Sequence, residues 1–323
     1  MTVDLRLDAA VRYLRAHLPK DSDCSLSIFV DPTLGDAVGA APVILQALRS
    51  GLLRRIDIPI QHSDIAPESR PYLLHAESEL EAEKAIELTL RYGLEEAFAT
   101  PSPLSSPRHV CAWIVGERQP HALAARLAKA GLIRNPEGVS RPFRYWDPRV
   151  MWHLPRAMEP SMWTTLRANL GCWLALDMCN ELRQISDVLH QISRSNTLSS
   201  EAPVKYTVTQ WAALARIRSI NLALSQAREW NVSPTQETAA QIDCLIKACH
   251  SFGFETEQDA QVFVACGLTS HPRFFDHEGV KSALNQAHAN SQSVLSALGK
   301  FDDSFWDELR SGNSNLEKII GEA

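Results

Sequence analysis

Long apolar runs are missing from this sequence. No stretch approaches the ~18 consecutive apolar residues that a membrane-spanning helix requires, so we expect neither a span nor a membrane partner. Residues 1–6 include Asp4 and Arg6 and lack the apolar core of a secretory signal. We therefore expect a cytoplasmic protein.

The short motifs of the common catalytic folds are also missing. The sequence contains no G-x-x-x-x-G-K-[ST], G-x-G-x-x-G, H-E-x-x-H, G-x-S-x-G or EF-hand loop. Each of these patterns builds one geometry: a phosphate cradle, a dinucleotide turn, a zinc helix, a nucleophile elbow or a calcium cage. Enzymes that depend on these geometries are disfavoured, and we expect a protein without catalytic residues, cofactor or metal.

Paired cysteines are lacking as well. The cysteines number seven, an odd count, and none forms a C-x-x-C motif. Scattered cysteines in apolar surroundings are typical of reduced, mostly buried thiols in a cytosolic protein. They are Cys24, Cys111, Cys172, Cys179, Cys244, Cys249 and Cys266.

Positive charge is scarce in the second half of the chain. Residues 1–169 hold 20 Lys and Arg and 20 Asp and Glu, so 12 of the 32 basic and 18 of the 38 acidic residues lie in 170–323. The whole net charge of −6 therefore belongs to 170–323. Nucleic acid is not expected as a partner, because phosphate binding needs clustered cations. The acidic half suits either a basic protein partner or a solvated helical surface.

What the sequence does contain is enough apolar residues for two domains. Its 323 residues, 45% of them hydrophobic, are about twice the ~150 residues of an ordinary domain. We predict an α+β protein with an N-terminal α/β domain over 1–192, whose small mixed sheet is covered by helices. A Ser-rich linker at 193–203 leads to an all-α domain over 204–323.

The N-terminal domain alternates helical and extended patterns. Apolar residues at 7, 11, 14 and 18 predict an amphipathic first helix. Alternating or continuous apolar runs predict strands over 25–31, 71–76, 109–115 and 172–176 and a hairpin of 132–134 with 139–146. Ser78 and Glu81 form a capping box for a helix that we expect to reach Arg91 and end at Gly93. Further helices are predicted over 36–53, 120–131, from 147, and 160–171.

The C-terminal domain reads as helical throughout. Thr209 is the predicted cap of its first helix, and Ser233 with Gln236 forms a capping box for the second. Gly253 is predicted to end that helix, and Thr256 to begin a third. Two more helices are expected over 278–298 and 302–310.

The densest segment spans residues 141–152. Its arginines suit bidentate carboxylate binding, and its tryptophans suit a buried interface. Asp147 is also a predicted N-cap, with Pro148 in the first helical position, so maintenance of the fold and contact with a partner both remain open. The candidate site residues are Phe143, Arg144, Tyr145, Trp146, Asp147, Arg149 and Trp152.

Three other groups of residues could be functional sites, but their patterns favour ordinary structural roles. Cysteine and histidine over 249–277 fit no zinc spacing and read as core thiols with surface histidines. A cysteine nucleophile at 172 or 179 with His190 as base lacks a third orienting group. The acidic run over 79–87 is typical of a solvated helix face. The first set is Cys249, His250, Cys266, His271 and His277, and the last is Glu79, Glu81, Glu83 and Glu87.

The segment Phe143-Arg144-Tyr145-Trp146-Asp147-Pro148-Arg149 resembles the F-R-x-x-D-P-R signature of the Tap/Tec-type adaptor family, the effector chaperones of type VI secretion. The order of elements upstream is similar, with an early strand reaching Asp31, the 70–74 segment and the Trp113 strand. Residues 253–263 and 274–276 resemble the helical C-terminal part of the family. Trp146 stands where a second Tyr is frequent.

The resemblance implies a non-enzymatic adaptor in the cytoplasm of a Gram-negative bacterium. Such a protein binds a toxic effector, its cognate partner, and helps load it onto the VgrG or PAAR spike. The alternative is a small-molecule hydrolase that uses a cysteine or an unrecognised carboxylate pair. A deep pocket with convergent titratable groups would favour the hydrolase.

Overall fold

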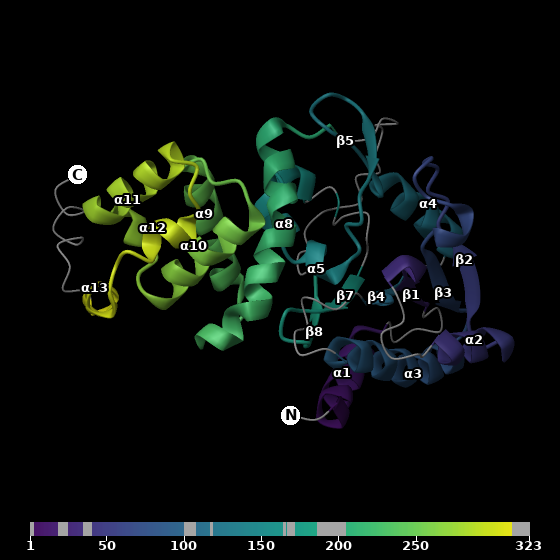
Figure 1. Ribbon diagram of the computed structural model, residues 1–323. Helices are drawn as coiled ribbons and strands as arrows, with labels where there is room; N and C mark the ends of the chain where they lie inside the picture. The colour runs from purple at the N-terminus through teal and green to yellow at the C-terminus, as the bar shows by residue number, and fades with distance from the viewer. Residues whose placement is uncertain are drawn as a thin grey trace. The chain divides into compact units, whose positions relative to one another are not determined.

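The computed structural model describes residues 3–18, 25–34, 41–99, 108–116, 119–163, 166, 172–185 and 205–311. The chain divides into two compact units, Met1–Ala215 and Arg216–Ala323. The first contains a sheet with helices and the described elements of the second are helices (Figure 1), which confirms the predicted fold class. The predicted linker over 193–203 lies outside the described residues.

A six-stranded sheet is the centre of the first unit. Its strand order is β2-β3-β1-β4-β7-β8, and every ladder in it is antiparallel. The alternation of helices and strands predicts a mixed sheet. The observed sheet is antiparallel instead, because β1 lies between β3 and β4. These two strands run in the same direction but do not pair with each other. The strands are β1 (Leu26–Val30), β2 (Arg54–Asp57), β3 (Tyr72–Ala76), β4 (Val110–Val115), β7 (Cys172–Leu176) and β8 (Leu182–Gln184).

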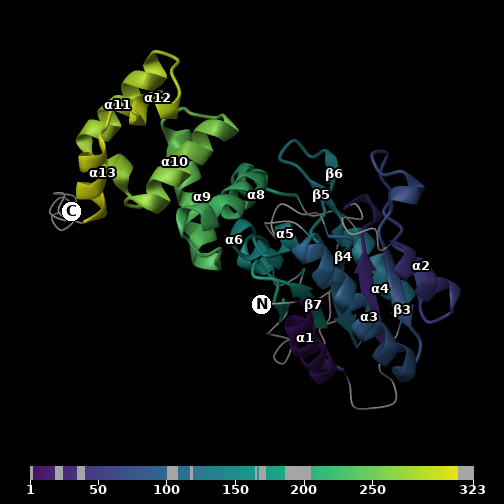
Figure 2. The same ribbon diagram turned by 60° about the horizontal axis from the view of Figure 1, so that its bottom comes forward.

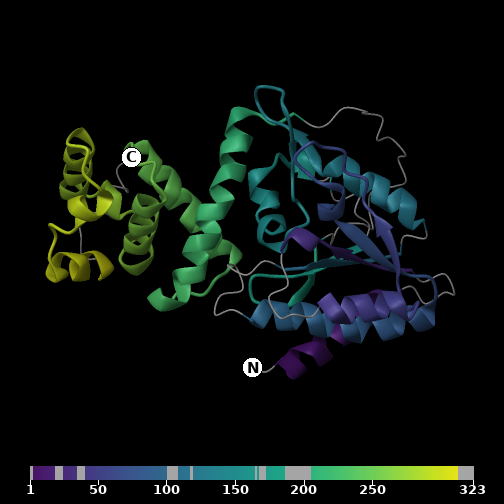
Figure 3. The same cartoon turned by 45° about the vertical axis from the view of Figure 1, so that its right-hand side comes forward.

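Helices cover both faces of this sheet. Helices α1 (Val3–His17), α2 (Ala41–Arg49) and α3 (Glu79–Phe98) lie on one face, and α4 (Pro120–Ala130) lies on the other (Figures 1 and 3). Leu26, Ile28 and Val30 of β1 point into the core beneath α1–α3, while Phe29 points to the opposite face. The sheet is therefore buried on both sides, as its continuous apolar strands require.

Helix α3 is longer than the sequence predicts. The Ser78–Glu81 capping box is confirmed, but the helix passes through Gly93 and ends at Phe98. A Cβ atom at Gly93 would lie 3.0 Å from the Cη2 atom of Trp113 on β4. The glycine thus allows a close approach of helix and indole, and the prediction that it ends the helix is wrong.

A small hairpin and two short helices follow α4. Strands β5 (Leu132–Arg134) and β6 (Ser140–Pro142) pair antiparallel, so the second predicted strand ends at Pro142 rather than at residue 146. Helices α5 (Pro148–Met151) and α6 (Leu154–Ala157) come next, and Asp147 caps α5 as predicted. Part of the predicted 160–171 helix lies outside the described residues.

The described part of the second unit is helical, and several of its helices have polar caps. It begins within α8 (Val208–Gln226), whose cap is Thr207, bonded reciprocally with Gln210, and not the predicted Thr209. Thr235, not Ser233, caps α9, because its hydroxyl accepts the Thr238 N–H. The predicted Thr256 cap of α10 is confirmed. The remaining elements are η3 (Ala227–Trp230), α9 (Gln236–Ser251), α10 (Glu257–Thr269), η4 (Phe274–Asp276), α11 (Glu278–Ala289), α12 (Val294–Leu298) and α13 (Asp303–Arg310).

These helices pack as neighbouring pairs. Helix α9 lies against α10, and α11 lies against α12 (Figure 2). The predicted single helix over 278–298 is two helices, because the chain turns at Ser291 with a φ of 53° and Ser293 caps α12. Gly253, with a φ of 88°, follows the C-cap of α9 as predicted. Within the described ranges, no helix combines the length and apolar character needed to cross a membrane.

Candidate functional site

The middle of the 143–152 segment lies in the interior of the first unit, on the face of the sheet that carries Phe29. Trp146 stacks on Phe29 of β1, with ring centroids 5.3 Å apart, and Tyr145 lies 6.2 Å from Trp173 of β7. The side chains of Tyr145 and Trp146 are fully buried. Two of the predicted site residues therefore form part of the apolar layer that covers the sheet.

A buried carboxylate anchors this layer. Asp31 directly follows β1, is 1% exposed, and accepts a 2.8 Å hydrogen bond from Nε1 of Trp146 through Oδ2. Its Oδ1 accepts the backbone N–H and the hydroxyl of Thr33, at 2.9 and 2.6 Å. Arg144 places its Nε atom 3.9 Å from Oδ2 of Asp31. The sequence identifies Asp31 only as the end of a strand, because its indole partner, Trp146, lies 115 residues away.

Asp147 and Arg149 form a local pair. Oδ1 of Asp147 accepts the backbone N–H of Arg149 at 2.9 Å, which caps α5. The Arg149 guanidinium also binds the same carboxylate, with Nε at 3.0 Å from Oδ1 and Nη2 at 2.6 Å from Oδ2. Burial is the largest single effect and lowers the pKa of Arg149, but the hydrogen bonds and charge of Asp147, together with the charge of Asp31, raise that pKa overall. Asp147, Pro148 and Arg149 are thus held together by local bonds at the start of α5.

A buried arginine that the sequence analysis does not single out lies near this pair. Arg108 precedes β4, is 2% exposed, and donates to the carbonyl of Leu176 and to Oδ1 of Asn180, at 3.0 and 2.8 Å. Burial lowers the pKa of Arg108 to about 10, although the carboxylates of Asp147 and Asp177 oppose that shift. A cation this deep in the fold requires nearby anions.

The carboxylate of Glu96 completes the arrangement from α3. It accepts the backbone N–H groups of His109 and Val110, both at 3.1 Å, and the hydroxyl of Tyr92 at 3.0 Å. We call Asp31, Glu96, Arg108, Asp147 and Asn180 the polar joint, because together they bind the ends of β1, β4 and β7 to α3 and α5. A network of this kind stabilises one arrangement of the elements when every member is paired.

The other predicted residues of the segment reach the surface. The side chain of Arg144 is 51% exposed. Phe143 is half-buried, with its ring 6.2 Å from that of Tyr206, and Trp152 is half-buried and donates from Nε1 to the Leu176 carbonyl. The structure thus separates an interior set (Tyr145, Trp146, Asp147) from a partly exposed set (Phe143, Arg144, Arg149, Trp152).

The cysteines and histidines over 249–277 act as structural groups. Cys249 is buried and donates to the Phe254 carbonyl, and burial raises the pKa of Cys249 to about 12 and that of Cys266 to about 11. His271 and His277 accept backbone N–H groups through Nδ1. Across the described ranges, no group of three or more His, Cys, Asp or Glu side chains is placed to hold a metal ion.

The two remaining candidate groups are the cysteine–histidine pair and the acidic run on α3. His190, the proposed base for Cys172 or Cys179, lies outside the described residues. Three residues of the acidic run on α3 have partners: Glu81 belongs to the capping box, Glu83 binds Arg15 of α1 at 2.8 Å, and Glu87 lies 3.6 Å from Arg91.

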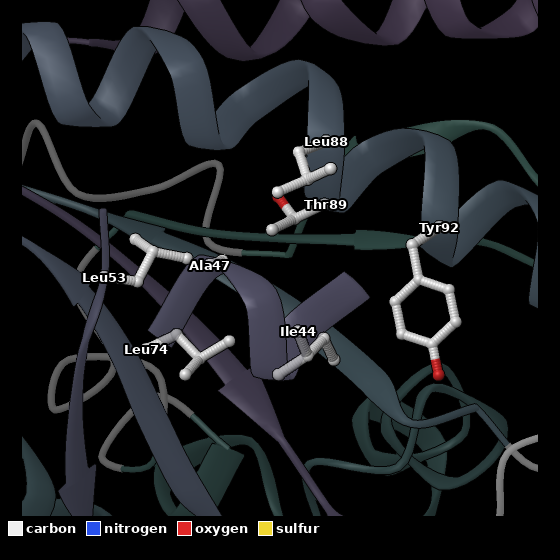
Figure 4. Close-up of a pocket in the computed structure, with 7 residues that line it drawn as sticks. All are labelled: Ile44, Ala47, Leu53, Leu74, Leu88, Thr89 and Tyr92. Carbon is white, nitrogen blue, oxygen red and sulfur yellow. The ribbon is translucent and has the colours of Figure 1, made fainter. Parts of the chain in front are cut away.

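An apolar recess beneath α2 and α3 is closely packed. Figure 4 shows side chains from these helices converging on Leu53 and Leu74 of the sheet region, and the recess has no space for a water molecule. It is part of the core. Its lining residues are Ile44, Ala47, Leu53, Leu74, Leu88, Thr89 and Tyr92.

A cleft of about 360 Å³ lies between α1 and the turn before β8. Arg6 donates to the Cys179 carbonyl and lies 3.9 Å from Glu181, while Arg183 binds Glu181. Two arginines of the cleft therefore share one carboxylate, that of Glu181. The lining residues are Leu5, Arg6, Ala9, Ala10, Tyr13, Asn180, Glu181, Leu182 and Arg183.

Comparison with known proteins gives no match to this chain, whether with family models, curated proteins or solved structures.

Proposed function

We propose that the protein is a non-enzymatic adaptor that binds a type VI secretion effector in the cytoplasm and helps load it onto the VgrG or PAAR spike. The proposal starts from the resemblance of residues 143–149 to the F-R-x-x-D-P-R signature of the Tap/Tec-type adaptors. It is further supported by the physical role of each residue in that segment.

The observation that carries the proposal is the joint use of the signature residues. Asp147 caps α5 and holds Arg149 through the same carboxylate, while Pro148 occupies the first helical position. Arg144 approaches the buried Asp31 from the segment's other end. These contacts give Arg144, Asp147, Pro148 and Arg149 defined structural roles, which support the proposal.

An adaptor needs surfaces for two different proteins. The chain supplies two compact units of different composition, one α/β and charge-balanced, the other helical and acidic. In the first unit, the half-exposed Arg144 lies 3.9 Å from Asp31 of the polar joint, and the half-buried Trp152 donates to the Leu176 carbonyl. Arginine and tryptophan are the residue types that contribute most to protein–protein binding.

The test is reconstitution of the complex that an adaptor must form. The proposal predicts genes for a large toxin and a spike protein next to the gene for this chain. Both proteins are co-expressed with the tagged full-length chain, and the purified material is analysed by size-exclusion chromatography with mass measurement. We expect stoichiometric binding of the toxin, and a larger assembly when the spike protein is added. If the intact chain binds neither protein in dilute, low-salt buffer, the adaptor function is wrong.

A further inference from the structure

An aromatic surface stands at α13 in the second unit. Phe301 and Phe305 stack with centroids 4.4 Å apart, and Trp306 lies 5.4 Å from Phe305 and 6.1 Å from Phe301. All three side chains are half-buried. We call these three residues the α13 aromatic face.

The face is held from beneath. Trp306 lies 6.1 Å from the fully buried Phe274, and Leu309, on the next turn of α13, is 1% exposed. The imidazole of His277 meets Phe305 edge-on, with centroids 5.0 Å apart. The rings are therefore ordered before any partner arrives, which lowers the entropy lost on binding.

Exposed acidic side chains outnumber the cations in and beside the face. Asp302, Asp303, Asp307 and Glu308 are all exposed, against the exposed Lys300 next to Phe301 and Arg310 at the end of α13. The one cation within α13, Arg310, is engaged with Asp307 at 2.7 Å. The Ser304 hydroxyl and the Phe305 N–H, which bind the Asp302 carboxylate, lower the pKa of Asp302, so its charge persists in mildly acidic buffer.

We infer that the α13 aromatic face binds a cationic amphipathic segment, rich in Lys or Arg with apolar residues between them, on the protein partner of this adaptor. The apolar residues of the segment cover the rings. Its cations lie against the ring faces and against the acidic rim, which we define as Asp302, Asp303, Asp307 and Glu308. Both contacts strengthen as water is excluded. A second copy of this chain is a poor occupant, because two acidic rims would face one another. The inference rests on the proposed function and adds the chemistry of one partner.

Charge reversal at the rim is the sharpest test, because it leaves the rings in place. The test variant is Asp303→Lys with Glu308→Lys. The matched control is Glu237→Lys with Glu229→Lys, which changes the net charge of the same unit equally; Glu237 stands in the first turn of α9 as Asp303 stands in the first turn of α13. All four carboxylates are exposed. Thermal melting of both variants establishes that the fold is retained.

The probe is a labelled helical peptide of Leu and Lys, about 14 residues or four turns long, with a Leu/Glu peptide of the same pattern as its control. Fluorescence anisotropy with the full-length chain measures binding at about 50 mM and about 500 mM salt. We expect binding of the Lys peptide only, weakened at high salt, and about tenfold weaker for the α13 variant but within about twofold of wild type for the control. Equal losses in both variants would mean diffuse attraction to an acidic unit and would overturn the inference.

A second measurement separates this inference from the proposed function. The same two variants are co-expressed with the neighbouring toxin and spike proteins, and complex formation is quantified. Loss of one partner in the α13 variant alone supports the inference. If wild type, variant and control all bind both partners equally, the inference is wrong and the adaptor function stands; if wild type binds neither, the adaptor function itself is wrong.

Discussion

Trp146 donates a 2.8 Å hydrogen bond from its indole nitrogen to Oδ2 of Asp31, although 115 residues separate the two. The bond joins the segment that resembles the adaptor signature to the end of β1, and both side chains are almost completely buried. An acceptor that carries a charge makes such a bond stronger than an ordinary one. The core of the first unit and the candidate site therefore depend on one another.

The first prediction concerns this bond. Trp146→Phe keeps the stacking on Phe29 but leaves the Asp31 carboxylate with one donor fewer, so we expect the free energy of unfolding to fall by about 2–4 kcal/mol. The control is Trp152→Phe, which removes a bond to a neutral carbonyl and is expected to lower it by about 1 kcal/mol. Urea unfolding measures both, and equal values would mean that the charge of Asp31 does not matter.

The second prediction concerns Asp147. Asp147→Ala removes a helix cap of ~0.5–2 kcal/mol and also the partner of Arg149, so we expect a lower melting temperature and less soluble protein. Asp147→Asn keeps a capping oxygen and is expected to lie between wild type and the Ala variant. A variant of unchanged stability that no longer binds the partner would show that Asp147 acts at the interface instead of in the fold.

The third prediction is a pH dependence. His75 on β3 is buried, its Nδ1 atom lies 2.9 Å from the Ser27 hydroxyl, and burial lowers the pKa of His75 from 6.5 while the Glu77 carboxylate opposes that shift. The unfolded chain therefore takes up this proton first as the pH falls. His75 contributes stability that is present above pH 6.5 and is lost as the pH falls toward the folded-state pKa.

Urea midpoints of wild type and His75→Gln, measured in steps from about pH 8 to about pH 5, isolate this contribution. We expect the wild type to lose stability below pH 6.5 more steeply than the variant. Parallel curves would show that His75 has the same pKa in the folded and unfolded states.

The fourth prediction concerns the contact between α3 and β4. Gly93→Ala improves helix propensity by about 1 kcal/mol but places a methyl group 3.0 Å from Trp113, which is fully buried and bonded to Thr89. We expect net destabilisation, because adding one methyl group to a well-packed core lowers the free energy of unfolding by about 1–3 kcal/mol. Lys84→Ala at an exposed position of the same helix is the control and should change the stability little. A more stable Gly93→Ala protein would mean that the indole moves aside freely.

Much of this fold follows from local patterns. The apolar runs of β1, β3, β4 and β7 and the caps at Ser78, Asp147 and Thr256 are correctly predicted, because strand burial and capping depend on neighbouring residues. β2 is missed because it is an edge strand whose Arg54, Arg55 and Asp57 are exposed, so it lacks an apolar signature.

The polar joint could not be predicted, for a different reason. Asp31, Glu96 and Arg108 each have an ordinary local context. The pairing of β1 with β4 places Asp31 beside His109, while Glu96 and Asp147 come from α3 and the start of α5. Likewise, Gly93 has the sequence signature of a helix end, but its lack of a side chain makes room for Trp113 of β4. Contacts between distant segments are not encoded in spacing.

The central claim is that the protein stabilises a client protein, and the soluble yield of that client tests it most directly. The neighbouring toxin is expressed alone, with the full-length chain, and with the Trp146→Phe variant, and its soluble fraction is measured together with the melting temperature of any complex. A client that binds only the folded chain must stabilise that chain in return. We therefore predict a high soluble yield of toxin with the wild-type chain and a scarce or aggregated toxin when it is expressed alone. We also predict a raised melting temperature for both proteins in the complex. Equal toxin yield with and without the chain, and no change in either melting temperature, would contradict the account.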